Sequence, residues 1–155
     1  MINRWFLLMV LGSWTTLAAA DNALHVGQWK KNLAESINMP DPSYQETVLV
    51  RRSDSILDFT WTGVAANGKT DSFSYSGKVD GKERELPGEM SIYGTMTATA
   101  DGITRSVLKY PDGSTEDKMC VLVTQDKMTC YATLTSAAGK PTLFKEVFDR
   151  VKTLR

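Results

Sequence analysis

The sequence predicts an all-β fold, an antiparallel up-and-down β-barrel of about ten strands. Two observations predict it. Tight-turn sequences recur at short, even spacing, and the segments between them alternate apolar with polar residues or are rich in β-branched and aromatic residues. The turns are Asn67-Gly68, Asp80-Gly81, Asp101-Gly102, Asp112-Gly113 and Gly139-Lys140-Pro141. Asn-Gly and Asp-Gly supply the positive φ that tight hairpin turns require.

The expected strands are joined by short connections, so consecutive strands should pair in antiparallel fashion. They are residues 26–31, 45–52, 56–65, 70–79, 82–86, 91–100, 104–110, 116–123, 128–135 and 143–150. An open row of ten strands would leave two exposed edges. Closing the sheet into a barrel removes these edges, whereas a β-sandwich, the alternative, only blunts them.

Large aromatic residues share the inward face of two adjacent strands in this arrangement. Alternation places Phe59 and Trp61 on one face of their strand, and Phe73 and Tyr75 on one face of the next. Small barrels either fill their interior with side chains or leave room for one small molecule. Phe59, Trp61, Phe73 and Tyr75 are therefore the candidate ligand-binding residues, with a packed core as the alternative reading of each ring.

Cys120 and Cys130 are the two cysteines of the chain. With a turn centred near Gln125, these positions face each other across a hairpin, and both side chains point to the same side of the sheet. In an oxidising compartment this arrangement predicts a structural disulfide. A metal site is not expected, because it needs more ligands than these two thiols and no histidine is near them.

The N-terminal segment has the pattern of a cleavable signal peptide. Arg4 precedes an apolar run over residues 5–11, and Ala18-Ala19-Ala20 satisfies the small-x-small cleavage rule. Residues 5–20 include polar side chains and fall short of the roughly 20 apolar residues of a membrane span, so no stable membrane anchor is expected. We therefore expect residues 1–20 to be a signal peptide cleaved after Ala20, residues 21–155 to form a single domain, and the mature protein to be periplasmic or secreted.

Charge and residue usage exclude several classes of function. Removal of residues 1–20 takes away one charge, that of Arg4, and leaves 17 basic against 18 acidic residues. Nucleic acids and anionic membrane surfaces require a basic excess, so neither is an expected partner. His25, the one histidine, is expected to be an exposed residue near the mature terminus, and Glu116 a solvated strand end. No catalytic constellation or cofactor-binding motif is recognised, so an enzyme is not expected.

The two ends of the domain resemble a known group of barrels. Gly27-Gln28-Trp29-Lys30-Lys31-Asn32, followed by Ser36 and Pro40, opens the domain, and Val147-Phe148-Asp149-Arg150 closes it. This pairing resembles the lipocalin-like (calycin-type) barrels, and more specifically an uncharacterised family of secreted bacterial lipocalin-like proteins. The resemblance implies that Arg150 packs across Trp29 and closes one end of the barrel. The chain departs from that group at residues 124–127, where the group has Asp-Gly, which leaves the geometry of this hairpin open.

These observations favour two functions. The first, which rests mainly on the resemblance, is an exported lipocalin-like barrel that binds a small apolar ligand in its interior. The alternative is a non-enzymatic envelope protein with a filled core that acts through its surface, as an inhibitor, scaffold or assembly partner.

Overall fold

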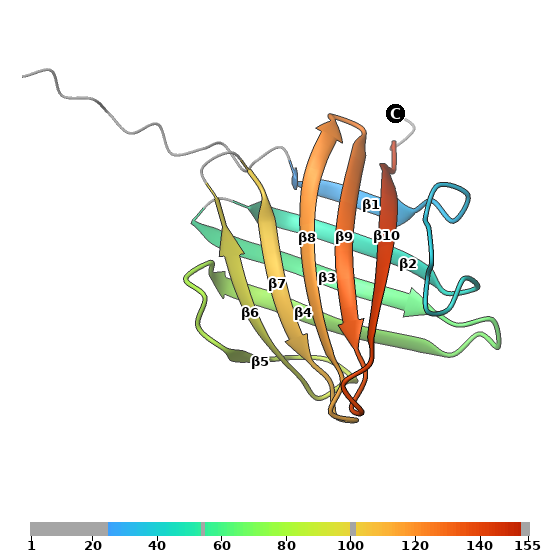
Figure 1. Cartoon of the computed structure of the whole chain (residues 1–155). Helices are drawn as coiled ribbons and strands as arrows, with labels where there is room; N and C mark the ends of the chain where they lie inside the picture. The colour runs from blue at the N-terminus through green and yellow to red at the C-terminus, as the bar shows by residue number, and fades with distance from the viewer. Residues whose placement is uncertain (1–24, 54, 100–101, 153–155) are drawn as a thin grey trace, which may run out of the picture.

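Ten antiparallel strands form one continuous sheet that curls into a nearly closed barrel (Figure 1). The computed structural model describes residues 25–53, 55–99 and 102–152, so the expected signal peptide lies outside the described residues. The strands are β1 (Gly27–Lys31), β2 (Gln45–Ser53), β3 (Ile56–Val64), β4 (Thr70–Lys78), β5 (Arg84–Leu86), β6 (Ile92–Ala98), β7 (Thr104–Lys109), β8 (Thr115–Thr124), β9 (Lys127–Thr135) and β10 (Pro141–Arg150). The predicted strands therefore match the observed ones to within two residues at each end.

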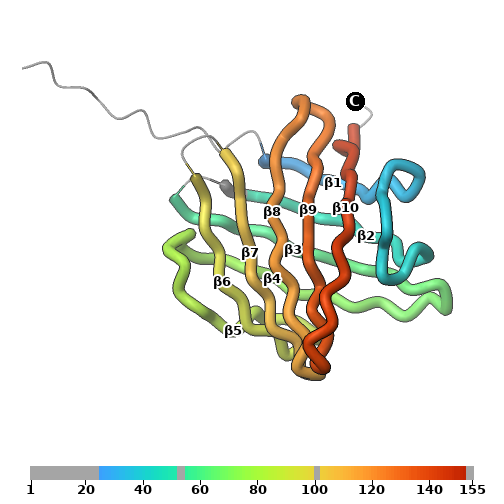
Figure 2. The backbone as a smooth tube through the Cα atoms, in the orientation of Figure 1, coloured from blue at the N-terminus to red at the C-terminus, as the bar shows by residue number. Residues whose placement is uncertain are grey.

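The strand order is the up-and-down order that short connections predict. Strands that are neighbours in the sheet are consecutive in sequence, with one exception: β1 pairs with β10 as well as with β2. Figure 2 shows β6 to β10 in front, crossing β1 to β4 behind them. The first strand thus meets the last, and the barrel prediction is confirmed over the sandwich alternative.

The remaining opening, between β4 and β5, is bridged by the segment that follows β5. Ser74 N donates to Pro87 O at 2.7 Å, and Glu89 N donates to Ser72 O at 3.0 Å. Gly88 has a φ of 157°, and a Cβ on it would lie 2.3 Å from Ser72 O. Only glycine allows this close backbone approach, so Gly88 is needed to close the barrel.

Four hairpin turns follow the predicted chemistry: glycines 68, 102, 113 and 139 have positive φ, as these turns require. Gly81 also has positive φ, but its turn joins β4 to β5, which lie at the two ends of the sheet and do not pair as predicted. The β8–β9 hairpin forms without glycine: its ladder shifts register between Leu122 and Thr124, then closes through Thr124 and Lys127. The hairpin therefore forms without the Asp-Gly pattern, with a shift of register beside its turn.

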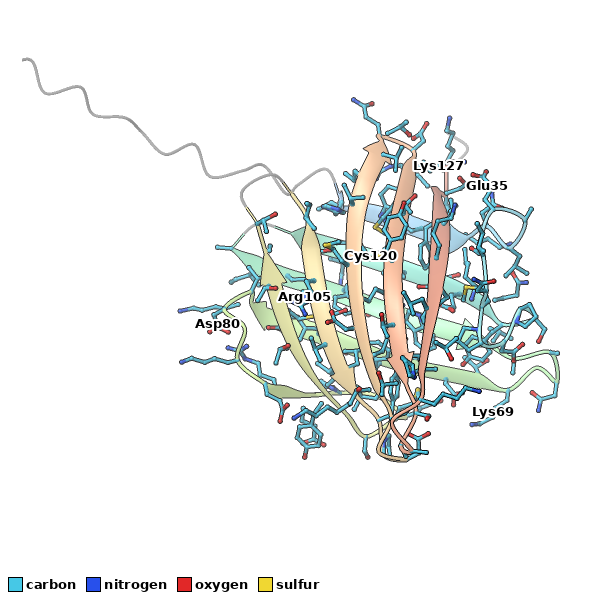
Figure 3. The ribbon with its side chains drawn as sticks, in the orientation of Figure 1. Glu35, Lys69, Asp80, Arg105, Cys120 and Lys127 are labelled. Carbon is cyan, nitrogen blue, oxygen red and sulfur yellow. A yellow bond between two sulfur atoms is a disulfide. The ribbon has the colours of Figure 1, made fainter. Side chains whose placement is uncertain are left out.

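The connection between β1 and β2 runs beside β10, where Ile37 N donates to Lys145 O at 2.8 Å and Lys145 N donates to Ile37 O at 3.0 Å. It begins with a single turn, in which Ser36 N donates to Asn32 O at 3.1 Å. Lys127 Nζ, at the start of β9, lies 2.6 Å from Glu35 Oε1 in this connection, and Figure 3 shows the two side chains together. Within the described part of the chain, no helix is long and apolar enough to cross a membrane.

Candidate functional site

Two adjoining cavities lie inside the barrel. The inner cavity has a volume of about 120 Å³, and the outer cavity has a volume of about 460 Å³ and reaches the loops at residues 39–44 and 110–114. Trp61, Phe73, Leu108, Glu116 and Lys118 line both cavities. The combined space is in the range of pockets that hold small molecules.

The inner cavity has a mainly apolar wall drawn from both halves of the barrel. Its apolar lining includes Val48, Val50, Leu57, Phe59, Trp61, Phe73, Met96, Leu108, Met128 and Phe148. On each strand these residues occupy the alternate positions whose side chains point into the barrel, so the alternation in the sequence brings them together. A molecule in this cavity would be held by burial of apolar area.

The four aromatic residues singled out in the sequence form one cluster on β3 and β4. Phe59 is paired with Tyr75 across the ladder, and Trp61 with Phe73. The Trp61 and Phe73 rings are stacked with centroids 5.1 Å apart, and the Phe59 and Tyr75 rings with centroids 6.2 Å apart. Phe59, Trp61 and Phe73 line the inner cavity, whereas Tyr75 is not among its lining residues. Tyr75 is 2 % exposed, and its hydroxyl donates to Lys78 O.

One edge of the aromatic wall depends on a glycine. Tyr44, in the segment before β2, stacks on Trp61 with the centroids 5.9 Å apart. A Cβ on Gly63 would lie 2.1 Å from the Tyr44 ring, so the absence of a side chain there makes room for the stack. The Tyr44 hydroxyl donates to Asp71 Oδ2 at 3.1 Å. Burial, together with this neighbouring carboxylate, raises the pKa of Tyr44 to about 12.

The opposite end of the barrel is closed by Trp29 and Arg150, as the resemblance implies. Trp29 is fully buried, and Arg150 Cζ lies 4.1 Å from its ring centroid. Arg150 Nε also donates to Gln125 O at 2.6 Å, and Trp29 Nε1 donates to His25 O at 2.8 Å. Gly27 has a φ of 143°, and a Cβ there would lie 2.3 Å from Arg150 Nη1. The glycine of the Gly-x-Trp motif thus leaves space for the guanidinium.

The predicted disulfide is present. Cys120 on β8 and Cys130 on β9 are directly opposed in the ladder, and their sulfur atoms are bonded with the Cα atoms 4.0 Å apart. Both residues line the inner cavity. The bond therefore fixes the β8–β9 hairpin at the side of the cavity.

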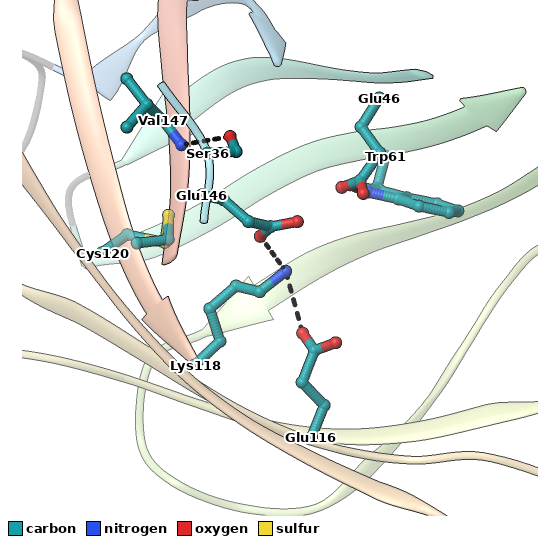
Figure 4. Close-up of a disulfide and its surroundings, with 9 residues drawn as sticks. Ser36, Glu46, Trp61, Glu116, Lys118, Cys120, Glu146 and Val147 are labelled. Carbon is teal, nitrogen blue, oxygen red and sulfur yellow. Dashed lines mark hydrogen bonds and ion pairs between the residues drawn. A yellow bond between two sulfur atoms is a disulfide. The ribbon is translucent and has the colours of Figure 1, made fainter. Parts of the chain in front are cut away.

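Charged side chains gather in the interior at the boundary of the two cavities. This interior charge cluster consists of Lys31, Glu46, Glu116, Lys118 and Glu146. Lys118 Nζ lies 2.9 Å from Glu116 Oε1 and 2.7 Å from Glu146 Oε2 (Figure 4). Lys31 Nζ contacts Glu46 Oε1 and lies 3.9 Å from Glu146 Oε1. The unfavourable burial of each charge is thus offset by an opposite charge.

The interior charge cluster is joined to the aromatic wall through hydrogen bonds. Trp61 Nε1 donates to Glu46 Oε2 at 2.9 Å, and Tyr110 OH donates to Glu116 Oε2 at 3.3 Å. Figure 4 shows Lys118 extending between Glu116 and Glu146, with Glu46 and Trp61 across the interior from it. A ligand in contact with Trp61 would therefore also approach carboxylate oxygens.

Two carboxyl groups of the cluster, those of Glu46 and Glu146, differ in proton affinity. Burial raises the pKa of Glu146 to about 7; the Lys118 charge opposes this rise and the Glu46 charge adds to it. Burial also acts to raise the pKa of Glu46, but the charges of Lys118 and Lys31 outweigh it and leave that pKa below its ordinary value. For Lys118, burial favours the neutral form, yet the surrounding carboxylates hold its pKa well above the ordinary value. Glu146 therefore holds its proton more tightly than an ordinary glutamate does.

The interior charge cluster was not predicted from the sequence, and two residues lie elsewhere than expected. Glu116, expected to be solvated, is buried in the cluster, and His25, expected to be exposed, is 4 % exposed and lines the inner cavity. The alternation of side chains along β8 could have indicated the burial of Glu116. Glu116 lies two positions from Lys118 and four from Cys120, so the three side chains point to the same face. All three line the inner cavity. Among the described residues, no group of three or more histidine, cysteine, aspartate or glutamate side chains is arranged to hold a metal ion.

Comparisons with known proteins support the fold. No family model matches the chain, and no curated protein matches its sequence. A redesigned β-barrel superposes with a TM-score of 0.56 at 14% identity, covering 87% of this chain and 98% of the design. The redesigned barrel mFAP1, bound to DFHBI, has a TM-score of 0.52 at 18% identity and covers 86% of this chain and 100% of the design. The S-type phycobiliprotein lyase CPES from Guillardia theta has a TM-score of 0.52 at 11% identity, covering 86% of this chain and 92% of the lyase. At these identities the likeness is one of fold, an antiparallel β-barrel.

Proposed function

We propose that this protein is an exported, non-enzymatic barrel that binds one small molecule with an apolar body inside the barrel. The observation that carries the proposal is the inner cavity of about 120 Å³, walled by Phe59, Trp61 and Phe73 and continuous in its lining with an outer cavity of about 460 Å³. An apolar ligand that fills the cavity buries its own apolar surface and that of the cavity wall, and this burial stabilises the complex. That a barrel of the same fold is bound to DFHBI supports this use of the interior.

Export is the second part of the proposal. The N-terminal pattern, with Arg4, the apolar run and the alanines ending at Ala20, supports cleavage by a signal peptidase. A disulfide between Cys120 and Cys130 supports folding in an oxidising compartment. The packing of Arg150 on Trp29 supports membership of the secreted bacterial lipocalin-like family. N-terminal sequencing of protein from the envelope or medium should begin at Asp21; a retained Met1 would contradict export.

The binding proposal is tested with protein purified from its own compartment. Native mass spectrometry should detect a retained small molecule, and isothermal titration calorimetry should detect binding of a small neutral aromatic alcohol, 1-naphthalenemethanol, by the emptied protein. Absence of both would contradict interior binding.

A surface function is the second candidate, because one specific feature favours it. Met119, Tyr131 and Leu143 are 46%, 55% and 69% exposed, and they line a shallow groove on the outside of β8, β9 and β10. An exposed apolar patch of this kind is typical of a protein contact. If the interior takes up no small molecule, this face becomes the site to test.

A further inference from the structure

The wall of the outer cavity is unevenly charged. Five carboxylate residues line it, three from the barrel interior and two from the loops at its mouth: Asp41, Glu46, Asp112, Glu116 and Glu146. Among the described residues that line this cavity, Lys118 is the only basic one. A ligand that enters the barrel by this route therefore meets a region of negative potential.

The two lysines of the interior charge cluster are already engaged by the cluster itself. Lys31 is fully buried behind the cavity wall, in contact with Glu46. Lys118 lies between Glu116 and Glu146, at 2.9 and 2.7 Å. Two ammonium groups therefore face three carboxylates, which leaves one negative charge in excess when all five groups are ionised.

Two carboxyl groups in the cluster retain capacity for a further hydrogen-bond donor. Glu116 Oε1 and Glu146 Oε2 each contact the Lys118 ammonium, at 2.9 and 2.7 Å. Glu146 is 1 % exposed and Glu116 is 8 % exposed. A carboxylate group accepts more than one donor, so Glu116 and Glu146 can each accept a ligand N–H group in addition to Lys118.

Aromatic rings lie in the same wall as these carboxylates. Tyr44, Trp61, Phe73, Tyr110 and Phe144 line the outer cavity. The ring faces attract cations, and the effect is stronger away from water. Carboxylates and ring faces together favour a positive group and disfavour a negative one.

We propose that the ligand is an aromatic or aliphatic amine in its protonated form. Its apolar body would fill the inner cavity against Phe59, Trp61 and Phe73, and its ammonium group would lie near Glu116 and Glu146. This inference rests on the proposed function, since it assigns a chemical class to the molecule held in the interior. A ligand carboxylate at the same point would add to the excess negative charge, and a neutral hydroxyl would leave it uncompensated.

The test compares three molecules that share one ring system and differ in the polar group. These are 1-naphthylmethylamine, 1-naphthalenemethanol and 1-naphthoic acid, titrated into the emptied protein by calorimetry at pH 8 and fixed ionic strength. The amine should bind about tenfold or more tighter than the alcohol, and the acid weakest of the three.

Variants locate the effect. Glu116→Gln and Glu146→Gln should each weaken amine binding several-fold, leave alcohol binding nearly unchanged and strengthen binding of the acid. The matched control is Asp117→Asn: Asp117 follows Glu116 on β8 but pairs with Arg105 on the outside of the barrel, so this variant should bind all three molecules as the parent does. Circular dichroism checks that each variant is folded. If Glu146→Gln does not fold, Glu116→Gln and the parent series decide the question.

The outcomes separate this inference from the proposed function. If the alcohol binds and the amine binds no tighter, the amine inference is overturned while interior binding stands. If none of the three binds and native mass spectrometry detects no retained molecule, interior binding itself is overturned. If the amine preference persists in both folded glutamine variants, the site assigned to the ammonium group is wrong.

Discussion

Lys118 and Glu146 form an ion pair inside the barrel, with Lys118 Nζ 2.7 Å from Glu146 Oε2. Glu146 is also 3.9 Å from the ammonium of Lys31, so one carboxylate on β10 faces lysines from β8 and β1. Pairing offsets much of the free-energy cost of burying these charges, and removal of one partner would leave the others uncompensated. The pair therefore couples the stability of the barrel to the protonation of its interior.

The first prediction concerns the pH dependence of stability. The pKa of Glu146 is about 7 in the fold against an ordinary value of 4.5, so the native state holds this proton more tightly than the unfolded state does. The stabilising contribution is complete below pH 4.5 and is lost as the pH rises through about 7. In Glu146→Gln the group does not titrate, so the free energy of unfolding of the parent relative to this variant should fall by about 3 kcal/mol across that window.

Urea denaturation of the parent and Glu146→Gln at intervals between pH 4.5 and 8 measures this difference. Lys31, Glu46, Glu116 and Lys118 face Glu146 and are present in both proteins. The lowered pKa of Glu46 gives a contribution that is lost below its ordinary value of 4.5, outside the window. Parallel pH profiles for the two proteins would show that folding does not raise the pKa of Glu146.

The second prediction concerns the disulfide between Cys120 and Cys130. Because it closes a loop with a sequence separation of 10, its loss should lower the free energy of unfolding by about 2–3 kcal/mol in the chain-entropy model. The comparison is the parent before and after reduction, with denaturation followed by circular dichroism. The Cys120→Ala/Cys130→Ala double variant is the control, since reductant should leave its midpoint unchanged. Free alkylation of both thiols in the native parent would contradict the bond.

The third prediction concerns the closed end of the barrel. Gly27→Ala should be destabilising for two reasons: the φ of 143° is strained for alanine, and the new Cβ would lie 2.3 Å from Arg150 Nη1. Backbone strain of this kind costs about 1–3 kcal/mol. Arg150→Ala should cost about 2 kcal/mol through loss of the stacking on Trp29 and the bond to Gln125 O.

A double-mutant cycle separates the two reasons. In the Arg150→Ala background the steric conflict is gone and only the backbone strain remains, so Gly27→Ala should cost about 1 kcal/mol less there than in the parent. Free energies from urea denaturation of the four proteins give the coupling. Strict additivity would mean that the guanidinium does not restrict position 27.

Much of the fold was predictable because the determinants are local. Turns at Asp80-Gly81 and Asp112-Gly113 need only the positive φ of their glycines, and alternation along each strand then assigns the two faces. The Cys120–Cys130 bond followed from hairpin register together with the expected oxidising compartment. Closure through Gly88 was not predictable in this way, since it depends on the backbone of Ser72 in another strand.

The charged part of the site was not predicted because its partners lie far apart in the sequence. Glu46 lies on the same inward face of β2 as Val48 and Val50. This alternation indicates a buried carboxylate but does not identify its partners. The compensating charges are Lys31 on β1 and Lys118 on β8, and no local pattern connects these three strands. The aromatic pair of Trp61 and Phe73 lies on adjacent hairpin strands, so the same reasoning places it correctly.

The last prediction concerns Trp61. The effect of replacing this residue distinguishes a ligand-binding interior from a filled core. Its ring stacks on Phe73 and lines both cavities, so part of its surface faces space. Trp61→Ala should therefore cost less than the roughly 3–5 kcal/mol typical of a fully packed aromatic side chain. It should weaken binding of 1-naphthalenemethanol about fivefold or more, because a stacking surface is lost.

Tyr75→Ala is the matched comparison on the neighbouring strand. Tyr75 is 2 % exposed and is not among the residues that line the inner cavity, so its removal should carry the full stability loss, while the folded fraction should retain most of its affinity for the alcohol. Urea midpoints and calorimetric titrations of the parent and both variants give the two quantities together. A full stability loss in Trp61→Ala, with no binding by the parent, would mean that the rings are packed core and that the exposed face of β8, β9 and β10 is the functional surface.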